Sequence, residues 1–167
     1  MKVEVKRSAR RRKTISARII DNRLVLQIPA TLTKKEESIW VERMRARLEG
    51  KQKELEEREQ RKLDLLASEM NQRYLGGKAR PRSLVYSSRQ KTIFGSCSYR
   101  SGHIRISRRV RNFPRWVLSY VVLHELAHLI YPDHSRRFWE LLKAYRYTER
   151  ARAFLSGYRF GAAGRAT

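Results

Sequence analysis

Two histidines and a glutamate in one short stretch have the spacing of a metal site. His124, Glu125 and His128 spell His-Glu-x-x-His, and on a helix the two histidines lie on one face, with Cβ atoms roughly 5–6 Å apart. That separation lets two imidazole nitrogens reach one zinc ion. The glutamate follows the first histidine directly, which places it as a general base for a water molecule that the metal activates. The motif therefore predicts metal-assisted hydrolysis.

The residues around the motif predict a buried helix that ends directly after it. Pro114 is a start signal, because proline at the first helical position loses no hydrogen bond. Apolar side chains on more than one face indicate burial, at Trp116, Val117, Tyr120, Val121, Leu123, Leu126, Ala127 and Ile130. Polar groups inside such a helix are costly unless they are paired or bind a metal. Pro132 ends the helix, so the chain turns after His128 and His134 can return as a third ligand.

Other residues could complete the metal site. If His134 is not the third ligand, Asp133, Glu140 or Glu149 could serve. Cys97 could approach the metal as a fourth, inhibitory ligand, although a lone cysteine on a strand more often packs in the interior. Two histidines that share this spacing without binding any metal are the remaining alternative.

The chain is strongly basic. It has 167 residues and a net charge of +23, and residues 71–167 carry 20 Lys and Arg but only 4 Asp and Glu. Such a charge attracts polyanions, with nucleic acid first among them, unless the arginines only solvate the surface. The candidate contacts with nucleic acid are Lys6, Arg7, Arg10, Arg11, Arg12 and Lys13 near the N-terminus, and Arg108, Arg109 and Arg111 further on.

Cysteine content and hydropathy predict a cytoplasmic protein. The single Cys97 excludes an internal disulfide, and no apolar run near the N-terminus resembles a signal peptide. The longest apolar run, residues 117–123, is interrupted by Ser119 and is too short to span a bilayer. We expect a monomer without a membrane partner, whose other partner is a protein or peptide substrate.

The N-terminal half predicts a hairpin followed by helices. Apolar residues alternate with polar ones over residues 15–28, with Asp21-Asn22 between the two runs, as in a β-hairpin. Thr33 and Glu36 form a capping box at a helix start, and Gly50 is expected to interrupt that helix. A second helix then covers residues 51–74 and ends at Gly76-Gly77, with Leu55, Leu63, Leu66 and Met70 on its buried side.

The C-terminal half predicts a small sheet beside the metal-site helix. Short strands are expected at residues 83–87, 92–98 and 104–107, and helices at residues 135–145 and 148–155. An edge strand that passes the metal could bind an extended substrate as an added strand. The residues that would do so are Gly95, Ser96, Cys97 and Ser98, and the alternative is a purely structural strand.

Several motifs together resemble the YgjP-like metallopeptidase family. They are Phe94–Ser98, Gly102–Ile106, Pro114, Tyr120–His128, His134-Ser135 and Phe138-Trp139, and the N-terminal hairpin and Arg73–Gly77 fit the same pattern. The resemblance implies a minimal zincin-like fold, similar to SprT and WLM-type proteases that act on DNA-bound proteins. It implies zinc bound by His124, His128 and His134, with Glu125 as catalytic base. Phe94 stands where the family usually has Trp.

A metzincin, which shares the six-residue step to the third histidine, does not fit this chain. Metzincins have Gly where this chain has Tyr131 and need a methionine downstream, whereas no Met follows Met70.

These observations predict an α+β fold and a zinc-dependent peptidase. The fold comprises an N-terminal β-hairpin, long helices, a small and mostly antiparallel sheet, a metal-site helix and a C-terminal helix. Residues 1–32 would form a basic hairpin segment, residues 33–160 the metallopeptidase domain and residues 161–167 a disordered tail, in one compact unit. The expected substrates include nucleic-acid-associated proteins. The alternative is a basic nucleic-acid-binding module with a structural metal site, although structural zinc sites usually have cysteine ligands.

Overall fold

The chain forms two compact units that meet within one helix. The computed structural model describes residues 2–20 and 23–163. One unit comprises residues 1–57 and the other residues 58–167, and helix α1 (Lys34–Leu75) contributes to both. The division thus falls inside a helix, whereas the sequence analysis placed a boundary after residue 32 and expected one compact unit.

The first unit is built on a three-stranded sheet. Its strands are β1 (Lys2–Ser8), β2 (Ser16–Ile20) and β3 (Arg23–Pro29), in the order β1-β3-β2. The antiparallel pair β2 and β3 is the predicted hairpin, and its turn at Asp21-Asn22 lies outside the described residues. Leu24, Leu26 and Ile28 on the central strand are buried. The sequence analysis missed β1, which pairs in parallel with β3.

The capping box at the start of α1 forms as predicted. The hydroxyl oxygen of Thr33 accepts the amide of Glu36 at 3.3 Å, and the Glu36 carboxylate accepts the amide and the hydroxyl of Thr33, both at 2.8 Å. These hydrogen bonds lower the pKa of Glu36. Two donors at the helix end that lack helical partners are thereby satisfied.

The predicted break at Gly50 is wrong, because α1 runs through it. The helix has 42 residues, and a glycine in a helix costs only about 1 kcal/mol relative to alanine, which the strong helix formers around it offset. Leu55, expected on the buried side, is 47% exposed. The helix ends at the predicted glycines, since Gly76 and Gly77 have φ values of 59° and 72°.

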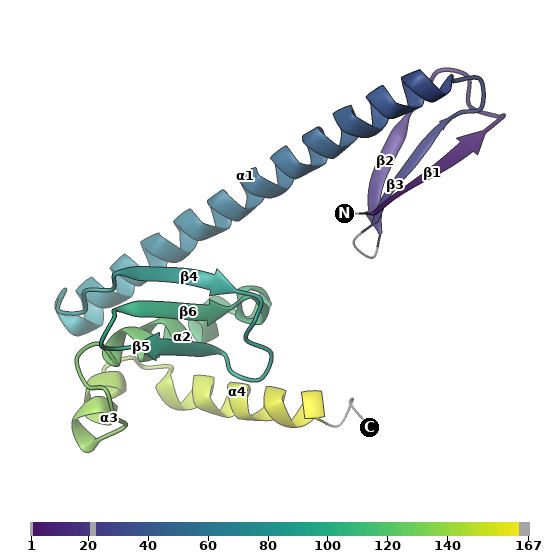
Figure 1. Ribbon diagram of the computed structural model, residues 1–167. Coiled ribbons are helices and arrows are strands. Elements are labelled where there is room, and N and C mark those ends of the chain that lie inside the picture. The colour runs from purple at the N-terminus through teal and green to yellow at the C-terminus, as the bar shows by residue number, and fades with distance from the viewer. Residues whose placement is uncertain (1, 21–22, 164–167) are drawn as a thin grey trace. The chain divides into compact units, whose positions relative to one another are not determined.

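The second unit combines a sheet with the rest of the helices (Figure 1). The strands β4 (Ser83–Ser87), β5 (Gly95–Ser98) and β6 (His103–Ser107) have the order β4-β6-β5. β4 is parallel to β6 and β5 is antiparallel to it. Both sheets of the protein are therefore mixed, rather than mostly antiparallel, within the predicted α+β class.

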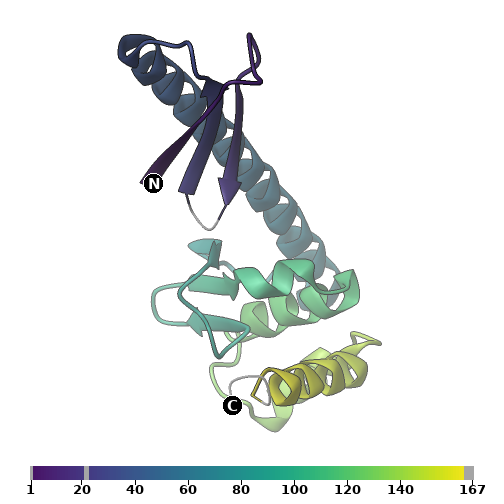
Figure 2. The ribbon, with the colours of Figure 1, turned by 90° about the vertical axis from the view of Figure 1, so that its right-hand side faces the viewer.

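Helix α2 (Arg115–Ala127) is the centre of this unit. A 3₁₀ turn, η1 (Arg108–Asn112), precedes it. It packs against β5 and β6 and against α3 (Arg136–Lys143) and α4 (Thr148–Ala163) (Figure 2). Because α4 continues to Ala163, residues 161–163 of the expected disordered tail are helical, and residues 164–167 lie outside the described residues.

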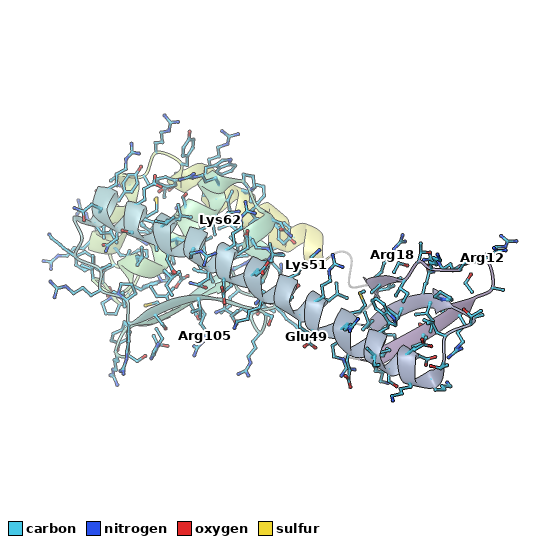
Figure 3. The ribbon with its side chains drawn as sticks, turned by 90° about the horizontal axis from the view of Figure 1, so that it is seen from above. Arg12, Arg18, Glu49, Lys51, Lys62 and Arg105 are labelled. Atoms are coloured by element: carbon cyan, nitrogen blue, oxygen red, sulfur yellow. The ribbon has the colours of Figure 1, made fainter. Side chains whose placement is uncertain are left out.

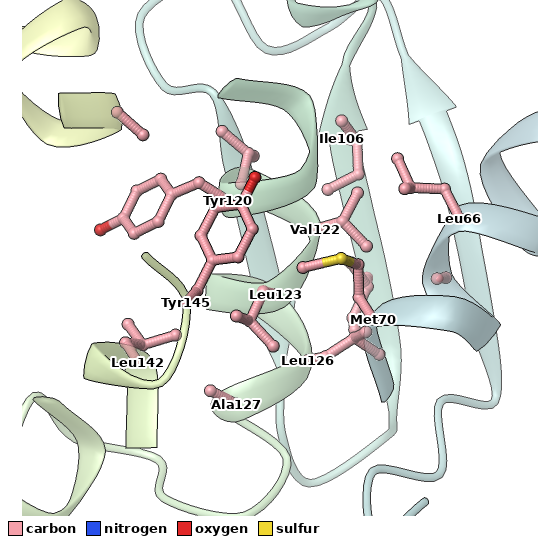
Figure 4. Close-up of a cluster of buried hydrophobic side chains, with 14 of the residues drawn as sticks. Leu66, Met70, Ile106, Tyr120, Val122, Leu123, Leu126, Ala127, Leu142 and Tyr145 are labelled. Atoms are coloured by element: carbon pink, nitrogen blue, oxygen red, sulfur yellow. The ribbon is translucent and has the colours of Figure 1, made fainter. Parts of the chain in front are cut away.

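The hydrophobic core surrounds α2 on most sides (Figure 4). Leu63, Leu66 and Met70 of α1 contribute to this core together with Ile104 and Ile106 of β6. Each such side chain contributes about 2 kcal/mol of transfer free energy when buried. The predicted burial of the metal-site helix is thus confirmed, and its functional side chains are held in rigid surroundings. Among the described residues, no helix combines the length and the apolar character needed to cross a membrane.

Candidate metal centre and its cleft

Three histidine rings converge at the C-terminal end of α2. His124 lies in the last turn of this helix, His128 is its C-cap residue, and His134 lies in the turn before α3. Their ring centroids are 4.9 Å (His124–His128), 5.1 Å (His124–His134) and 4.7 Å (His128–His134) apart. One potential ligand atom from each ring lies within 4.8 Å of the others. The helix ends at Ala127, and Pro132 between the second and third rings prevents it from continuing, so the chain can bring His134 back.

The arrangement of these rings fits a metal ion. The Nε2 atoms of His124 and His134 lie 3.2 Å apart, and Nδ1 of His128 is buried without a hydrogen-bond partner of normal geometry among the described residues. Among those residues, the cluster of potential ligands contains these three histidines, and Asp133, Glu140, Glu149 and Cys97 are not part of it. A set of three imidazoles is a donor set that zinc and other transition metals accept.

Two aromatic side chains fix the orientation of the rings. Phe138 of α3, which is fully buried, stacks on His128 with centroids 4.7 Å apart and 27° between the planes. Trp139 stacks on His134 at 5.5 Å and 23°. These two side chains thus form the wall behind the histidines.

Burial favours the neutral form of His124 and His128. Burial lowers the pKa of His124 to about 3, and the neighbouring charges of His128, His134 and Arg152 act in the same direction. Burial and His134 also lower the pKa of His128. Neutral imidazole is the form that binds a metal, since protonation occupies the donor nitrogen.

Glu125 lies against strand β5, beside the histidines. Its side chain is 6% exposed, and burial raises the pKa of this carboxyl to about 8. A Cβ atom built on Gly95 would lie 2.5 Å from Oε1 of Glu125. The strand can therefore approach the carboxylate only because residue 95 has no side chain.

Cys97 follows two residues later on the same strand and packs against the core. Burial, with a smaller contribution from the charge of Glu125, raises the pKa of its thiol to about 11. The thiol therefore stays protonated at neutral pH, and the thiolate is the form that binds metals. The structure favours the packing interpretation of Cys97 over a fourth ligand.

A cleft of ≈ 610 Å³ opens beside this site. His124 and Glu125 line it from α2, and the start of β5 lines it from the sheet. The opposite wall is α4, to which the sequence analysis assigned no role except Glu149 as an alternative metal ligand. The residues that line the cleft are Ile93, Phe94, Gly95, Tyr120, Val121, His124, Glu125, Glu149, Arg152, Ala153, Leu155, Ser156 and Arg159. Arg152, Ser156 and Arg159 share one face of a helix, but this spacing does not indicate that the face borders a cleft.

The four residues proposed for substrate binding all lie on β5, which is an edge strand. Of these, Gly95 borders the cleft. Ser96 accepts a hydrogen bond from Gln90 at 2.6 Å, so its hydroxyl has a partner within the protein. Ser98 is exposed and Cys97 is partly buried. The backbone of this edge, rather than its side chains, is what the strand offers to a substrate.

Several basic residues proposed for nucleic acid have partners within the protein. Arg7 donates to the carbonyl oxygens of residues 30 and 32 and pairs with Glu37 at 2.5 Å. Lys6 pairs with Glu4, and Arg11 donates to Gln27. The contacts of Arg7 and Arg11 connect β1 and the loop after it to the rest of the first unit, so they have a structural role, whereas the pair of Lys6 and Glu4 lies within β1.

Other basic side chains are spread over both units (Figure 3). Arg12 and Arg18 belong to the first unit and Arg105 to β6 of the second, where each is exposed. Arg109 donates to the carbonyl of Lys91 and lies over the rings of Phe94 and Tyr158, at 5.8 and 5.3 Å from their centroids. Arg109 thus has contacts within the protein.

The comparisons with known proteins agree with the site. Residues 78–153 match the family model described as YgjP-like, metallopeptidase domain. Neither the comparison with curated proteins nor that with solved structures found a match. The matched range contains the three histidines, Glu125 and Arg152, and it leaves out the N-terminal hairpin and Arg73–Gly77, to which the resemblance in sequence extended. The segment 78–153 of this chain belongs to the YgjP-like metallopeptidase family.

Proposed function

We propose that this protein is a zinc-dependent peptidase that hydrolyses peptide bonds in the cleft beside α2. His124, His128 and His134 would hold the zinc ion and Glu125 would act as the base. The observation that carries the proposal is the convergence of three imidazoles, with ligand atoms within 4.8 Å of one another, beside a buried carboxylate. Both His124 and Glu125 also face a cleft that a substrate can enter.

The donor set supports zinc as the metal. Three protein ligands leave a coordination position open, as in catalytic zinc sites, whereas structural sites use four and favour cysteine. Bound zinc would polarise the carbonyl group of the substrate and lower the pKa of water. The stacked rings of Phe138 and Trp139 would keep the ligands in place when the metal leaves or returns.

Glu125 moves the proton in this proposal. The oxygen of a water molecule bonds to the carbonyl carbon while Glu125 takes a proton from that water, and Glu125 then gives the proton to the amine nitrogen as the C–N bond breaks. A base works best when its pKa lies near the working pH, and burial moves the pKa of Glu125 from 4.5 towards this range. The reaction leaves Glu125 ionised and ready for another cycle.

Strand β5 would hold the substrate. Its free edge lies on the outside of the sheet, and Gly95 at its start borders the cleft beside Glu125. An extended peptide added there would be recognised through its backbone, which demands no particular sequence. This mode suits a peptidase that acts on exposed, unfolded segments of proteins.

The charge of the chain supports nucleic-acid-associated proteins as substrates. A net charge of +23 attracts polyanions and the proteins bound to them. Nucleic acid should then increase the rate of proteolysis at low salt, and the increase should disappear at high salt as counterions compete. A basic module that only binds nucleic acid would show the binding without hydrolysis.

The substitution Glu125→Gln tests the peptidase proposal. It keeps the shape of the side chain, so the folded protein should retain its zinc content while hydrolysis of an unfolded protein substrate is lost. Glu140→Gln is the matched control, because Glu140 is exposed on α3, pairs with Lys143 and does not line the cleft. Equal activity of the wild type and Glu125→Gln towards every protein tried, including proteins bound to DNA, would reject the proposal.

A further inference from the structure

We propose that Arg152 is a catalytic residue of this site and that its guanidinium stabilises the negative charge on the carbonyl oxygen during hydrolysis. The inference rests on the proposed peptidase function and assigns the donor that this chemistry needs in addition to the metal. Groups that are already oriented towards a developing charge are commonly the largest source of rate enhancement.

Arg152 lies where such a donor is required. It lines the cleft on the α4 side, across from His124 and Glu125 on α2. Tyr120 of α2 lines the same cleft, so this arginine of α4 and the proposed base of α2 border one common space. A substrate carbonyl that enters the cleft beside these residues therefore lies within the field of this arginine.

The guanidinium is held from two sides. Its Nη1 atom donates to both carboxylate oxygens of Glu149, at 2.9 and 3.1 Å. Its Cζ atom lies 4.6 Å from the ring centroid of Trp139, which itself stacks on His134. Within the described part of the chain, neither Nε nor Nη2 of Arg152 donates to any partner. Arginine has five N–H donors, so the fixed group still offers hydrogen bonds to a substrate.

Three tyrosines near α2 and α4 have other partners. Tyr120 lines the cleft, but its hydroxyl lies 3.5 Å from Nδ1 of His124, whereas the Nε2 atom of that ring faces His134. Tyr120 is therefore on the side of the ring away from the metal. Tyr145 donates to a main-chain carbonyl of α2, and Tyr147 accepts from the neighbouring arginine.

The other arginine of the cleft lies further along the same helix. Arg159 is seven residues after Arg152, which is about 10.5 Å of helix, and its guanidinium lies over the ring of Phe94 at 5.1 Å. Its position fits a contact with a substrate side chain better than a contact with the reacting bond.

The proposed step balances as follows. When the water oxygen bonds to the carbonyl carbon, the π electrons of the C=O bond move to the oxygen, which accepts hydrogen bonds from Arg152. When the C–N bond breaks, the C=O bond forms again and the amine nitrogen takes the proton from Glu125. Arg152 transfers no proton in this step, because a guanidinium group is not deprotonated in proteins.

The first experiment compares two arginines of α4. Arg150 lies two residues before Arg152, is exposed, and has its Cζ atom 4.8 Å from the ring centroid of Trp116, outside the cleft. Arg152→Met should lower kcat by roughly 100- to 1000-fold with KM and zinc content nearly unchanged, whereas Arg150→Met should keep full activity. Added guanidinium should restore part of the activity of Arg152→Met. A raised KM with unchanged kcat, or an equal loss in both variants, would overturn the assignment.

The second experiment measures binding rather than turnover. A peptide phosphonate carries the tetrahedral, negatively charged group that Arg152 would contact, and the product peptide lacks it. Calorimetry should show that Arg152→Met loses affinity for the phosphonate by about the factor by which kcat falls, with no loss for the product.

If the wild type cleaves peptides and Arg152→Met does so equally well, only this inference fails. If the wild type neither cleaves peptides nor binds the phosphonate, the peptidase proposal fails as well.

Discussion

At the scale of single residues, the site depends on the absence of a side chain at Gly95 as much as on its charged groups. The carboxylate of Glu125 occupies the space where a side chain on Gly95 would lie. Burial in that space raises the pKa of Glu125, and the same contact places the carboxylate beside the edge of β5. One glycine thus determines both the environment of the base and its distance from the strand.

Gly95→Ala should therefore reduce activity without loss of metal. The added Cβ would lie 2.5 Å from Oε1 and 2.7 Å from Cγ of Glu125, so the carboxylate must move. We expect kcat/KM to fall by about 100-fold, the size of effect that a 1 Å misplacement can have, while zinc content stays the same.

Gly157→Ala is the control for this substitution. A Cβ atom there meets nothing within 4 Å, and alanine in the middle of α4 should stabilise the helix by up to about 1 kcal/mol. If Gly95→Ala were as active as Gly157→Ala, the proposed role of the β5 contact would be wrong. Peptide hydrolysis and thermal unfolding of both variants measure the difference.

The metal-ligand spacing could be predicted from sequence because it is local. His124 and His128 are one helical turn apart, so helix geometry alone places them on one face. The return of His134 follows from Pro132, which must end the helix. The approach of Gly95 to Glu125 and the position of Arg152 depend on how β5 and α4 pack on α2, and such long-range contacts have no signature in local spacing.

At the scale of elements, α1 shows where local signals are reliable and where they fail. The capping box is specified by two residues three apart, and it forms as predicted. The predicted helix break at Gly50 is wrong because a glycine ends a helix only where the backbone needs a positive φ. At Gly50 the backbone continues as helix. Strand β1 was missed because its alternation at Val3 and Val5 is embedded in a basic run.

Gly50→Ala tests the continuous helix. Because a Cβ atom at residue 50 meets nothing within 4 Å, alanine should increase helicity and stabilise the first unit by about 1 kcal/mol. Circular dichroism and thermal denaturation would measure both effects. A helix that ended at Gly50 with positive φ would instead be destabilised by alanine, and that result would contradict the structure.

The capping box should make the start of α1 sensitive to acid. Hydrogen bonds from the amide and hydroxyl of Thr33 lower the pKa of Glu36 from 4.5. A lowered pKa in the folded state means that the stabilisation is full above pH 4.5 and is lost as the pH falls through the folded value.

Hydrogen exchange of the first-turn amides of α1 measures this effect. Glu36→Ala should exchange faster than the wild type at neutral pH, once the rates are corrected for intrinsic exchange, and the difference should shrink below pH 4.5. A difference that stayed constant down to strongly acidic pH would show that the carboxylate is not responsible. Glu42→Ala, further along the same helix, is the control.

At the scale of the whole molecule, the matched family segment is smaller than the unit that folds. The family model begins at residue 78, whereas the second unit begins at residue 58. The intervening part of α1 contributes Leu63, Leu66 and Met70 to the core around α2. This helix thus also supports α2, which carries His124 and Glu125.

This division predicts how truncated proteins should behave. A chain of residues 58–167 keeps every residue of the core cluster around α2, so it should fold, bind one zinc ion and hydrolyse peptides at a rate close to that of the full chain.

A chain of residues 78–167 loses Leu63, Leu66 and Met70. At about 2 kcal/mol for each buried side chain, the loss is about 6 kcal/mol, which is comparable with the whole stability of a typical domain. We expect this shorter chain to be unfolded by circular dichroism and to bind zinc weakly. If it folds and remains active, the C-terminal part of α1 is not a component of the catalytic unit. If the chain of residues 58–167 keeps its peptidase activity but no longer responds to nucleic acid at low salt, the first unit supplies the response.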